Sequence, residues 1–558
     1  MAPVAVLTHR SSASAPPHIA ARLWRALEHG FDALVGAGGN PLKQLGALGF
    51  LLLWLLVGSG AVLYAVLDTS ASGAYQSIEA LSREQWRWGS LLRGLHRYAA
   101  DAMVLVVLAH VVREWMLGRF RSFRAASWLT GVPLLLLLFV SAIGGFWLNW
   151  DRLGQFSATA TAEWLDALPG LASPLARNFL SGTQLNDRLF SLFVFVHLGV
   201  PLMLVFGLWF HVQRLSRAQV FPTRALATGT GLTLLILAAI RPVRSQGPAD
   251  LATVPATLNY DWLLLFIHPL TAATSAAMVW GLLVFFIALL LALPWLGAWR
   301  ARAQPVALRA ATGDAVEAGA VLPATSHTHW RPAALTQFVA EVDPDHCSGC
   351  RRCVEDCPYA AITMVPHPSG RVGMELAQVR SDLCASCGIC VGSCPSSTPF
   401  RSAEVLHTGI DMPQWPIDAL RRQMQSGLAA LPGPRRYVVF GCAEGADLGQ
   451  LSADEVLALP LVCTGLLPPS FIEYALRAGA DGVLVATCRE GGCAFRLGER
   501  WTRERLQGLR EPRLRASVSA NGWSLVAADR GDEAVLAAAL QALRSRTAES
   551  FEYPESTA

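Results

Sequence analysis

Long apolar segments are concentrated in the first 297 of this chain's 558 residues, and every cysteine lies after residue 346. The chain is 53% apolar, which is high for a soluble protein of this length. Six segments are long and apolar enough to cross a bilayer, near residues 45–67, 92–117, 128–150, 189–213, 225–241 and 271–296. The sequence therefore predicts a multidomain fold in which an all-α membrane half precedes a soluble, cysteine-rich half.

The segments that flank the spans predict the orientation of the chain. Residues 1–43 lack the pattern of a signal peptide. Instead, apolar residues recur there at helical spacing, at Ile19, Leu23, Leu27, Phe31 and Leu34. They predict an amphipathic helix on the membrane surface or against protein. Loops on the N-terminal side carry more Lys and Arg than the opposite loops, and the cysteines suit a reducing compartment. We therefore expect the inner membrane of a prokaryote, with the N-terminus and the cysteine-rich half in the cytoplasm.

Two of the predicted spans each carry a pair of histidines. His96 and His110 lie fourteen residues apart, and so do His197 and His211. Fourteen residues are close to four helical turns, so each pair shares one helix face with its members about 21 Å apart. Ionisable residues inside a membrane are costly and usually functional, and matched pairs on parallel helices are a poor fit to simple helix–helix hydrogen bonds. The pattern predicts two b haems, one between His96 and His197 and one between His110 and His211.

These residues resemble the cytochrome b family of the quinol-oxidising cytochrome bc complexes. The resemblance covers roughly residues 20–297, without the family's last two helices. It implies that Gly46 and Gly60 make room for haem edges. It also implies that Arg93 and Arg113, each three residues from a paired histidine, bind haem propionates.

Two further stretches resemble the family's outer quinol site but depart from its pattern. Gly145-Phe-Trp-Leu-Asn-Trp-Asp-Arg-Leu-Gly-Gln155 resembles the outer loop after the third span, with Asn149 where Pro is usual. Tyr260-Asp-Trp-Leu263 stands where the family has Pro-Glu-Trp-Tyr, so Asp261 replaces Glu. Asp261 and the nearby His268 are the candidate quinone-site residues. His268 could exchange a proton near neutral pH or serve a structural role.

The soluble half contains one cysteine spacing twice. The runs are Cys347-x2-Cys350-x2-Cys353-x3-Cys357-Pro358 and Cys384-x2-Cys387-x2-Cys390-x3-Cys394-Pro395. This spacing is typical of paired [4Fe–4S] clusters, in which the fourth Cys of each run binds the other cluster. Zinc usually takes two CxxC pairs instead. We therefore expect one cluster on Cys347, Cys350, Cys353 and Cys394, and a second on Cys357, Cys384, Cys387 and Cys390, within a ferredoxin-like α+β domain.

A third unit begins near residue 435. Strands are predicted at 437–440, 482–486 and 524–527, and helices at 471–477 and 533–544, so a small α/β domain with a parallel sheet is expected. Four cysteines follow or lie between these elements: Cys442, Cys463, Cys488 and Cys493. Such sheets place their sites beyond the carboxyl ends of strands. By spacing alone the four thiolates suit a [2Fe–2S] cluster or zinc equally well.

The segment Gly479-Ala-Asp-Gly-Val-Leu-Val-Ala-Thr-Cys-Arg-Glu-Gly-Gly-Cys493 resembles the delta (D-type) iron–sulfur subunit of methyl-viologen-reducing hydrogenases, as does Cys463 with Pro468 and Pro469. The resemblance covers about residues 435–510, with a single Cys442 where relatives often have several cysteines. It implies a [2Fe–2S] cluster, with zinc as the minor alternative. It also implies electron exchange with the flavoprotein of heterodisulfide reductase.

The sequence thus predicts a chain of electron carriers. The expected domains are an N-terminal segment (1–43), a di-haem membrane domain (44–297), a linker (298–340), a ferredoxin-like domain (341–402), a connector (403–434), a hydrogenase-delta-like domain (435–548) and a tail (549–558). No dinucleotide-binding fingerprint or P-loop stands in its usual context, so a cytoplasmic flavoprotein or a hydrogenase-like or heterodisulfide-reductase-like subunit is the expected partner.

The expected function is an oxidoreductase component that passes electrons between that partner and the quinone pool. Flow toward quinone is downhill because such clusters have low potentials, often near −400 mV. The alternative is a redox-sensing or anchoring subunit without quinone turnover. The net charge of +4 does not suggest nucleic acid binding. The cytochrome b resemblance also allows a homodimer.

Overall fold

The computed structural model describes residues 19–84, 88–168, 187–213, 215–253, 257–302, 339–401, 404–451 and 454–549. The chain divides into two compact units. The first comprises residues 1–213 and 218–325, and the second comprises residues 214–217 and 326–558. Most of the predicted linker, from residue 303 to 338, lies outside the described residues.

Five helices of the first unit are long and apolar enough to cross a membrane. They are α2 (Leu45–Val66), α4 (Trp88–Met116), α5 (Ala125–Asn149), α8 (Asp187–Val212) and α11 (Ala276–Arg302). The fifth predicted span is the shorter apolar helix α9 (Arg224–Ile240). The start of the sixth predicted span is a separate short helix, α10 (Ile267–Ala273), which ends before α11 begins. The predicted helical membrane half is confirmed.

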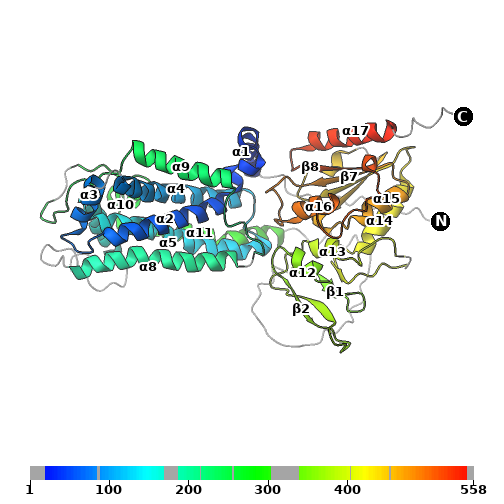
Figure 1. Cartoon of the computed structure of the whole chain (residues 1–558), viewed down its shortest axis with the longest axis horizontal. Coiled ribbons are helices and arrows are strands. Elements are labelled where there is room, and N and C mark those ends of the chain that lie inside the picture. Colours follow the sequence, from blue (N-terminus) through cyan, green and yellow to red (C-terminus); the bar gives the residue numbers. More distant parts are fainter. Residues whose placement is uncertain are drawn as a thin grey trace. The chain divides into compact units, whose positions relative to one another are not determined.

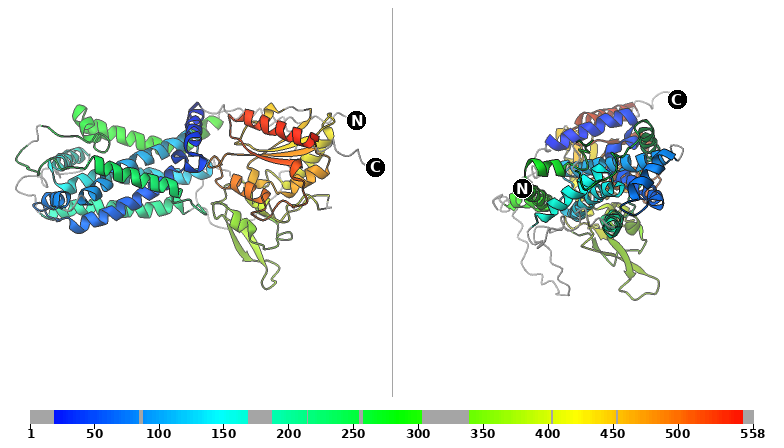
Figure 2. Two further views of the ribbon diagram at one scale, coloured as in Figure 1. Left: turned by 45° about the horizontal axis from the view of Figure 1, so that its top comes forward. Right: turned by 90° about the vertical axis from the view of Figure 1, so that its left-hand side faces the viewer.

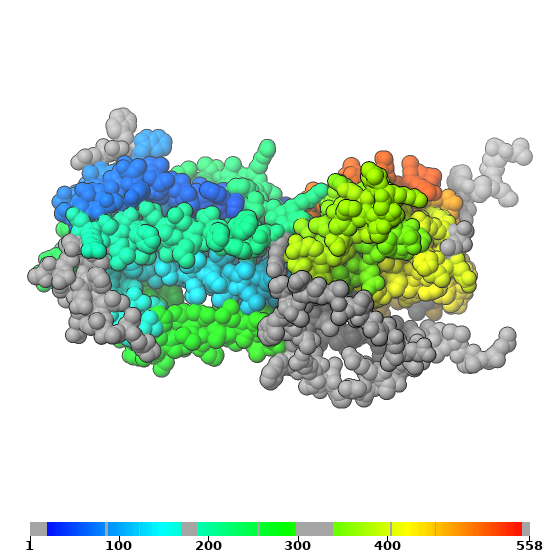
Figure 3. All heavy atoms as spheres, turned by 90° about the horizontal axis from the view of Figure 1, so that it is seen from below, coloured from blue at the N-terminus to red at the C-terminus, as the bar shows by residue number. Residues whose placement is uncertain are grey.

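The spanning helices pack side by side around a small apolar core (Figure 1). Helix α2 packs on α4, α5 packs on α8, and α9 packs on α4. Leu52, Met103, Leu138 and Leu204 are among the buried residues of that core. Figure 3 shows one lateral face of the unit, where the atoms of α8 lie exposed along its length. Since an exposed apolar surface of this extent would aggregate in water, it suits lipid.

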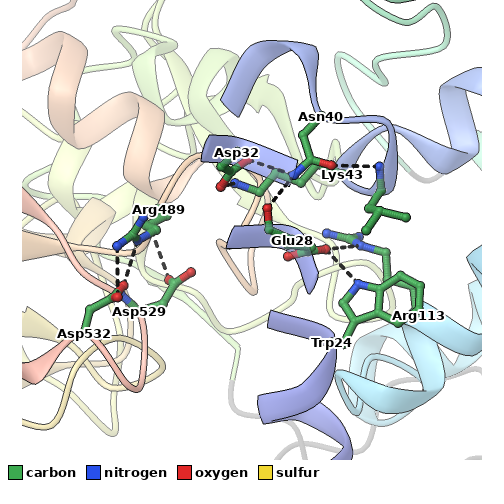
Figure 4. A network of polar contacts seen from close by, with 10 residues as sticks. Trp24, Glu28, Asp32, Asn40, Lys43, Arg113, Arg489, Asp529 and Asp532 are labelled. Atoms are coloured by element: carbon green, nitrogen blue, oxygen red, sulfur yellow. Dashed lines mark hydrogen bonds and ion pairs between the residues drawn. The ribbon is translucent and has the colours of Figure 1, made fainter. Parts of the chain in front are cut away.

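Three shorter helices flank the bundle. They are α1 (Ile19–Val35), α3 (Ala74–Glu84) and α6 (Arg152–Asp166). Helix α1 exposes the five apolar residues that the sequence placed on one face. Its opposite face is held by a polar network, in which Trp24 Nε1 donates to Glu28 Oε1 (2.9 Å) and Glu28 pairs with Arg113 of α4 (2.7 Å) (Figure 4). The amphipathic pattern of α1 therefore separates an anchored polar face from a free apolar one.

The second unit begins with two small antiparallel sheets and two short helices. Strand β1 (Glu341–Val342) pairs with β4 (Ile410–Asp411), and β2 (Ile362–Pro366) pairs with β3 (Glu375–Val379). Helices α12 (Arg352–Asp356) and α13 (Ile389–Ser393) each lie within one of the two cysteine runs. Strand β2 begins five residues after Cys357, the last cysteine of the first run.

A four-stranded parallel sheet forms the rest of the second unit. Its strands are β5 (Tyr437–Cys442), β6 (Val456–Leu461), β7 (Gly482–Thr487) and β8 (Trp523–Ala527), in the order β6-β5-β7-β8. The helices are α14 (Ile417–Ala430), α15 (Ser470–Arg477), α16 (Gly498–Leu506) and α17 (Glu533–Glu549). Helix α17 lies on one side of the sheet, as the left view of Figure 2 shows. The predicted parallel α/β domain is confirmed.

The sequence reasoning missed one strand and two helices of this domain. Strand β6 contains Pro460, which lowers the strand signal; proline is tolerated there because β6 is an edge strand. Helices α14 and α16 carry many charged and polar residues, so few apolar residues mark them in the sequence. Strand β6 ends just before Cys463 and helix α16 begins shortly after Cys493, so both lie beside the sites described next.

Candidate redox sites

The histidines of α4 and α8 meet in the membrane unit. The ring centroids of His96 and His197 lie 6.3 Å apart. Two metal–nitrogen bonds of about 2 Å each, plus roughly 1 Å from each nitrogen to its ring centre, give a separation of about 6 Å. His110 and His211 are near enough to interact electrostatically. The structure therefore brings the four histidines together in the two pairs that the sequence predicts, and the first pair has the spacing of two ligands on one metal.

Hydrogen bonds fix which nitrogen of each ring is free. Nδ1 of His96 lies 2.9 Å from Ser59 Oγ, and Nδ1 of His211 lies 3.0 Å from Thr130 Oγ1. Both hydroxyls donate to backbone carbonyls of their own helices, so they accept from the imidazole N–H. Nδ1 of His197 likewise bonds to the carbonyl oxygen of Ser141 (2.9 Å). In these three histidines Nε2 is left as the available ligand atom.

A glycine faces each of the four histidines. A Cβ at Gly60 would lie 3.0 Å from His96 Cε1, and one at Gly46 would lie 3.7 Å from His110 Cε1. On α5, a Cβ at Gly145 would lie 2.9 Å from His197 Cε1, and one at Gly131 would lie 3.4 Å from His211 Cε1. The sequence reasoning did not assign Gly131 and Gly145 to the haem sites, although they repeat the fourteen-residue spacing of Gly46 and Gly60.

The two arginines beside the histidines differ in what they bind. Both terminal nitrogens of Arg93 have protein partners: Glu79, Ser82, Asn149 and Ser245. Arg113 donates from Nε to Glu28 and from Nη1 to Glu114. Its Nη2 is buried and has no hydrogen-bond partner among the described residues. A free cationic donor next to His110 fits the carboxylate of a haem propionate.

The candidate quinone residues lie in the loop before α10 and in α10 itself. Asp261 forms an ion pair with Arg97, and its Oδ1 accepts from the backbone of Leu264 (2.7 Å). His268 is buried against Phe156, and its Nε2 lies 3.2 Å from Ser157 Oγ. Burial lowers the pKa of His268 to about 4, so its imidazole is neutral at pH 7. This environment favours a structural role for His268 over proton exchange near neutral pH.

The eight cysteines of the two runs gather in two crossed groups. Cys353 interacts with Cys347, Cys350 and Cys394, so the last cysteine of the second run joins the first run. One cavity is lined by the other four, Cys357, Cys384, Cys387 and Cys390. The last cysteine of each run therefore joins the group formed by the other run, because α12 packs directly against α13. This exchange matches the spacing rule for paired [4Fe–4S] clusters.

The last four cysteines are buried together in one cluster with Cys387 and Trp501. Within it, Cys463 interacts with Cys493, and Cys442 interacts with Cys488. In the described part of the chain, no three His, Cys, Asp or Glu side chains gather as tightly as a single metal ion requires. The contacts between the thiols group them into two neighbouring pairs, Cys442 with Cys488 and Cys463 with Cys493.

A buried charge network joins the ferredoxin-like part to the parallel-sheet part of the second unit. Arg505 has no exposed surface and forms an ion pair with Asp356, which directly precedes Cys357. Arg505 also donates to the carbonyls of Gly465 (2.9 Å) and Ile389 (3.3 Å). Arginine's planar fork suits such a site because it can satisfy several acceptors at once. No local pattern in the sequence indicates this network, because its members are far apart along the chain.

Comparisons with known proteins match three regions of the chain. Residues 40–219 match the family model for cytochrome b/b6/petB, and residues 346–398 match the 4Fe-4S dicluster domain. Residues 439–545 match the delta subunit of methyl-viologen-reducing hydrogenase. A solved structure described as hyperthermophilic respiratory Complex III aligns over 46% of this chain and 75% of its own, with 18% identity and a TM-score of 0.38. The chain is a multi-pass membrane protein that joins a cytochrome b region, a 4Fe-4S dicluster region and a hydrogenase-delta-like region in that order.

Proposed function

We propose that this chain is a membrane-bound electron-transfer subunit that links a cytoplasmic flavin or iron–sulfur oxidoreductase to the quinone pool. Its carriers are a [2Fe–2S] cluster, two [4Fe–4S] clusters and two b haems. The observation that carries the proposal is the set of four half-buried histidines, paired at two levels of one helix bundle, with a glycine opposite each ring. At Gly60 and Gly145 even a Cβ would crowd the facing ring, so glycine is required there.

The residues around the histidines suit haem b. Haem iron, when bound by two imidazoles, accepts and releases one electron at a time. Ser59, Thr130 and the carbonyl of Ser141 orient three of the rings through Nδ1. The free Nη2 of Arg113 offers a cation to a propionate. These contacts support a resident haem pair because each serves a part of the group that the protein itself leaves unpaired.

The direction and the partner follow from the chemistry of the remaining carriers. Cluster potentials are low, so electrons enter from a cytoplasmic flavoprotein, or from a hydrogenase-like or heterodisulfide-reductase-like subunit, and leave to quinone. The excess of Lys and Arg on one side supports a cytoplasmic location for the cysteine-rich unit. We place the quinone near the Asp261 loop, where Trp262 is exposed beside Tyr260.

A reduced-minus-oxidised optical spectrum of the purified chain, with haem and iron counted, tests the carriers. Two b haems and about ten cluster irons per chain are expected. His211→Ala should remove the inner haem and stop the iron–sulfur unit from reducing the outer haem. His268→Gln is the matched control, because it alters a buried histidine outside the pairs. Absence of haem from the wild-type chain would refute the cytochrome assignment, and full haem reduction in His211→Ala would refute the order of carriers.

A further inference from the structure

We propose that the [2Fe–2S] cluster is polarised by the protein. Cys442 and Cys488 bind one iron, Cys463 and Cys493 bind the other, and the reducing electron resides on the Cys463/Cys493 iron. The inference rests on the proposed function insofar as that function includes a [2Fe–2S] cluster at these four cysteines. Beyond that function, the proposal specifies which two cysteines bind each iron and from which iron the electron passes to the next carrier.

The pairing follows from where the four thiols lie. Cys442 ends β5 and Cys488 directly follows β7, and these neighbouring parallel strands end at the same edge of the sheet. Cys463 immediately precedes a short 3-10 turn that packs against α16, the helix that follows Cys493. Within each pair the two thiols lie close enough to interact with each other. In a [2Fe–2S] cluster each iron takes two of the four thiolates, so two adjacent pairs match two irons.

Gly498 marks the convergence of the second pair. A Cβ at this position would lie 2.1 Å from Cys463 Sγ and 3.3 Å from Cys493 Sγ. Both sulfurs therefore approach the same backbone atom at the start of α16, and a side chain there would overlap one of them. Neither Cys442 nor Cys488 is among the atoms nearest this position.

The two pairs differ in the hydrogen bonds that reach their sulfurs. Backbone N–H groups of Phe495, Gly498 and Glu499 donate to Cys493, and the N–H of Gly465 donates to Cys463 Sγ (3.4 Å). Two of these donors belong to the first turn of α16, where the helix dipole also favours negative charge. Donors to cluster sulfurs raise the reduction potential of the iron they serve.

The other pair faces acceptors and negative charge. The partner of Cys442 Sγ is the carbonyl oxygen of Val462, at 3.8 Å. The carboxylate of Asp529 interacts with Cys488 and is fixed by the backbone N–H of Arg489 (3.0 Å). Figure 4 shows Arg489 with Asp529 and Asp532. An added electron is disfavoured beside a carboxylate, so it should settle on the iron of Cys463 and Cys493.

The favoured iron is also the one that faces the next carrier. Cys387, a cysteine of the second [4Fe–4S] group, interacts with both Cys463 and Cys493. Ile389 packs against Gly465 in the same contact, where a Cβ on Gly465 would meet its side chain at 2.8 Å. The electron that arrives from an external one-electron donor, such as a flavoprotein, reduces one ferric iron. It then leaves to the [4Fe–4S] cluster beside Cys387, and no bond or proton changes place.

The test replaces each of the four cysteines by serine in the full chain enriched in ⁵⁷Fe. Mössbauer spectra of the reduced cluster distinguish its ferrous and ferric irons. Cys463→Ser and Cys493→Ser should alter the ferrous signal and reduce the equilibrium constant for reduction at least tenfold. Cys442→Ser and Cys488→Ser should alter the ferric signal and change that constant less. Any other grouping of the four serine variants by the signal they alter would overturn the proposal. An altered ferrous signal in Cys442→Ser would also overturn it.

A charge variant provides a second test if serine variants lose the cluster. Asp529→Asn should increase the equilibrium constant for reduction by about threefold or more, because it removes a negative charge near the cluster. Asp481→Asn is the matched control, because Asp481 lies at the opposite end of β7 and binds the N–H of Arg436. Equal effects of the two substitutions on the equilibrium constant for reduction would contradict the proposed polarisation of the cluster. A wild-type site that holds zinc would also overturn it, while two intact haems would leave the proposed membrane function standing.

Discussion

Glycine and histidine positions in the membrane unit are matched residue by residue. Helices α2 and α5 carry glycines at the same spacing as the histidines of α4 and α8, and each glycine faces one ring. The missing side chains leave room at two levels of the bundle. At these positions glycine is therefore as much a requirement of the site as the histidine ligand, because a single methyl group would occupy space beside the ring.

Gly145→Ala should reduce haem content from two toward one per chain, because its Cβ would lie 2.9 Å from His197 Cε1. Haem extracted from the purified protein and quantified per chain measures the effect. Gly281→Ala, on α11, is the matched control, because a Cβ there meets nothing within 4 Å. Equal haem content in the two variants would contradict the assigned role of Gly145.

Thr130→Val should raise the midpoint potential of the inner haem. The valine removes the acceptor for His211 Nδ1–H, so the imidazole becomes less basic and stabilises ferric iron less. The loss of one hydrogen bond suggests an effect equivalent to about 1 kcal/mol. A potentiometric titration of the haem bands measures it. Thr228→Val is the control, since the hydroxyl of Thr228 bonds only to helix carbonyls in the described structure, and an unchanged potential in Thr130→Val would contradict the role.

At the scale of elements, polar contacts decide how helices begin and where they are held. Helix α1 is fixed through Glu28 and Arg113, whose side chains are both almost fully buried. Asp411 ends β4, and its carboxylate accepts from the backbone of Met412 (2.8 Å) and of Ile417 (3.2 Å), the first residue of α14. The carboxylate thus connects the small β1–β4 sheet to the start of a helix.

Asp411→Asn should stabilise the start of α14 more at pH 7.5 than at pH 4.5. Burial raises the pKa of Asp411 to about 6. The folded state therefore binds a proton that the unfolded state releases, and wild-type stability increases as the pH falls from above 6 to about 4. Partial exposure limits the effect to about 1–2 kcal/mol. Amide hydrogen exchange of α14, compared between variant and wild type at each pH, measures it, and a pH-independent difference would disprove the assignment.

On the scale of the whole molecule, the chain places two chemically different units in series. The membrane unit exposes apolar side chains along its spanning helices. The iron–sulfur unit buries nine of its twelve cysteines, while Cys347 and Cys394 are intermediate and Cys350 is exposed. Each unit suits one solvent.

The charge bias of the loops predicts that Val372, in the iron–sulfur unit, faces the cytoplasm and that Arg83, in the last turn of α3, faces the opposite side. Both side chains are highly exposed. A cysteine introduced at Val372 should react with a membrane-impermeant maleimide in inverted vesicles only. One introduced at Arg83 should react in right-side-out vesicles only. The reverse result would invert the proposed topology.

Much of the fold and of the candidate site could be predicted because its signals are local. Apolar length determines the spans, fourteen-residue spacing determines which histidines share a face, and the cysteine runs place several ligands within one turn of chain. Strands β5, β7 and β8 were predictable for the same reason, since each is a short apolar run between polar turns. Such patterns depend on backbone periodicity, which sequence displays directly.

Tertiary structure alone decided the contacts between distant residues. It brought Gly131 and Gly145 to the histidines of another helix, gave Arg93 a full set of protein partners, and left Arg113 with a free buried donor. It also sorted the last four cysteines into two pairs and buried Arg505 between the two cysteine-rich parts of the second unit. Those outcomes depend on how side chains from separate elements pack, and packing is a property of the assembled core that no local pattern encodes.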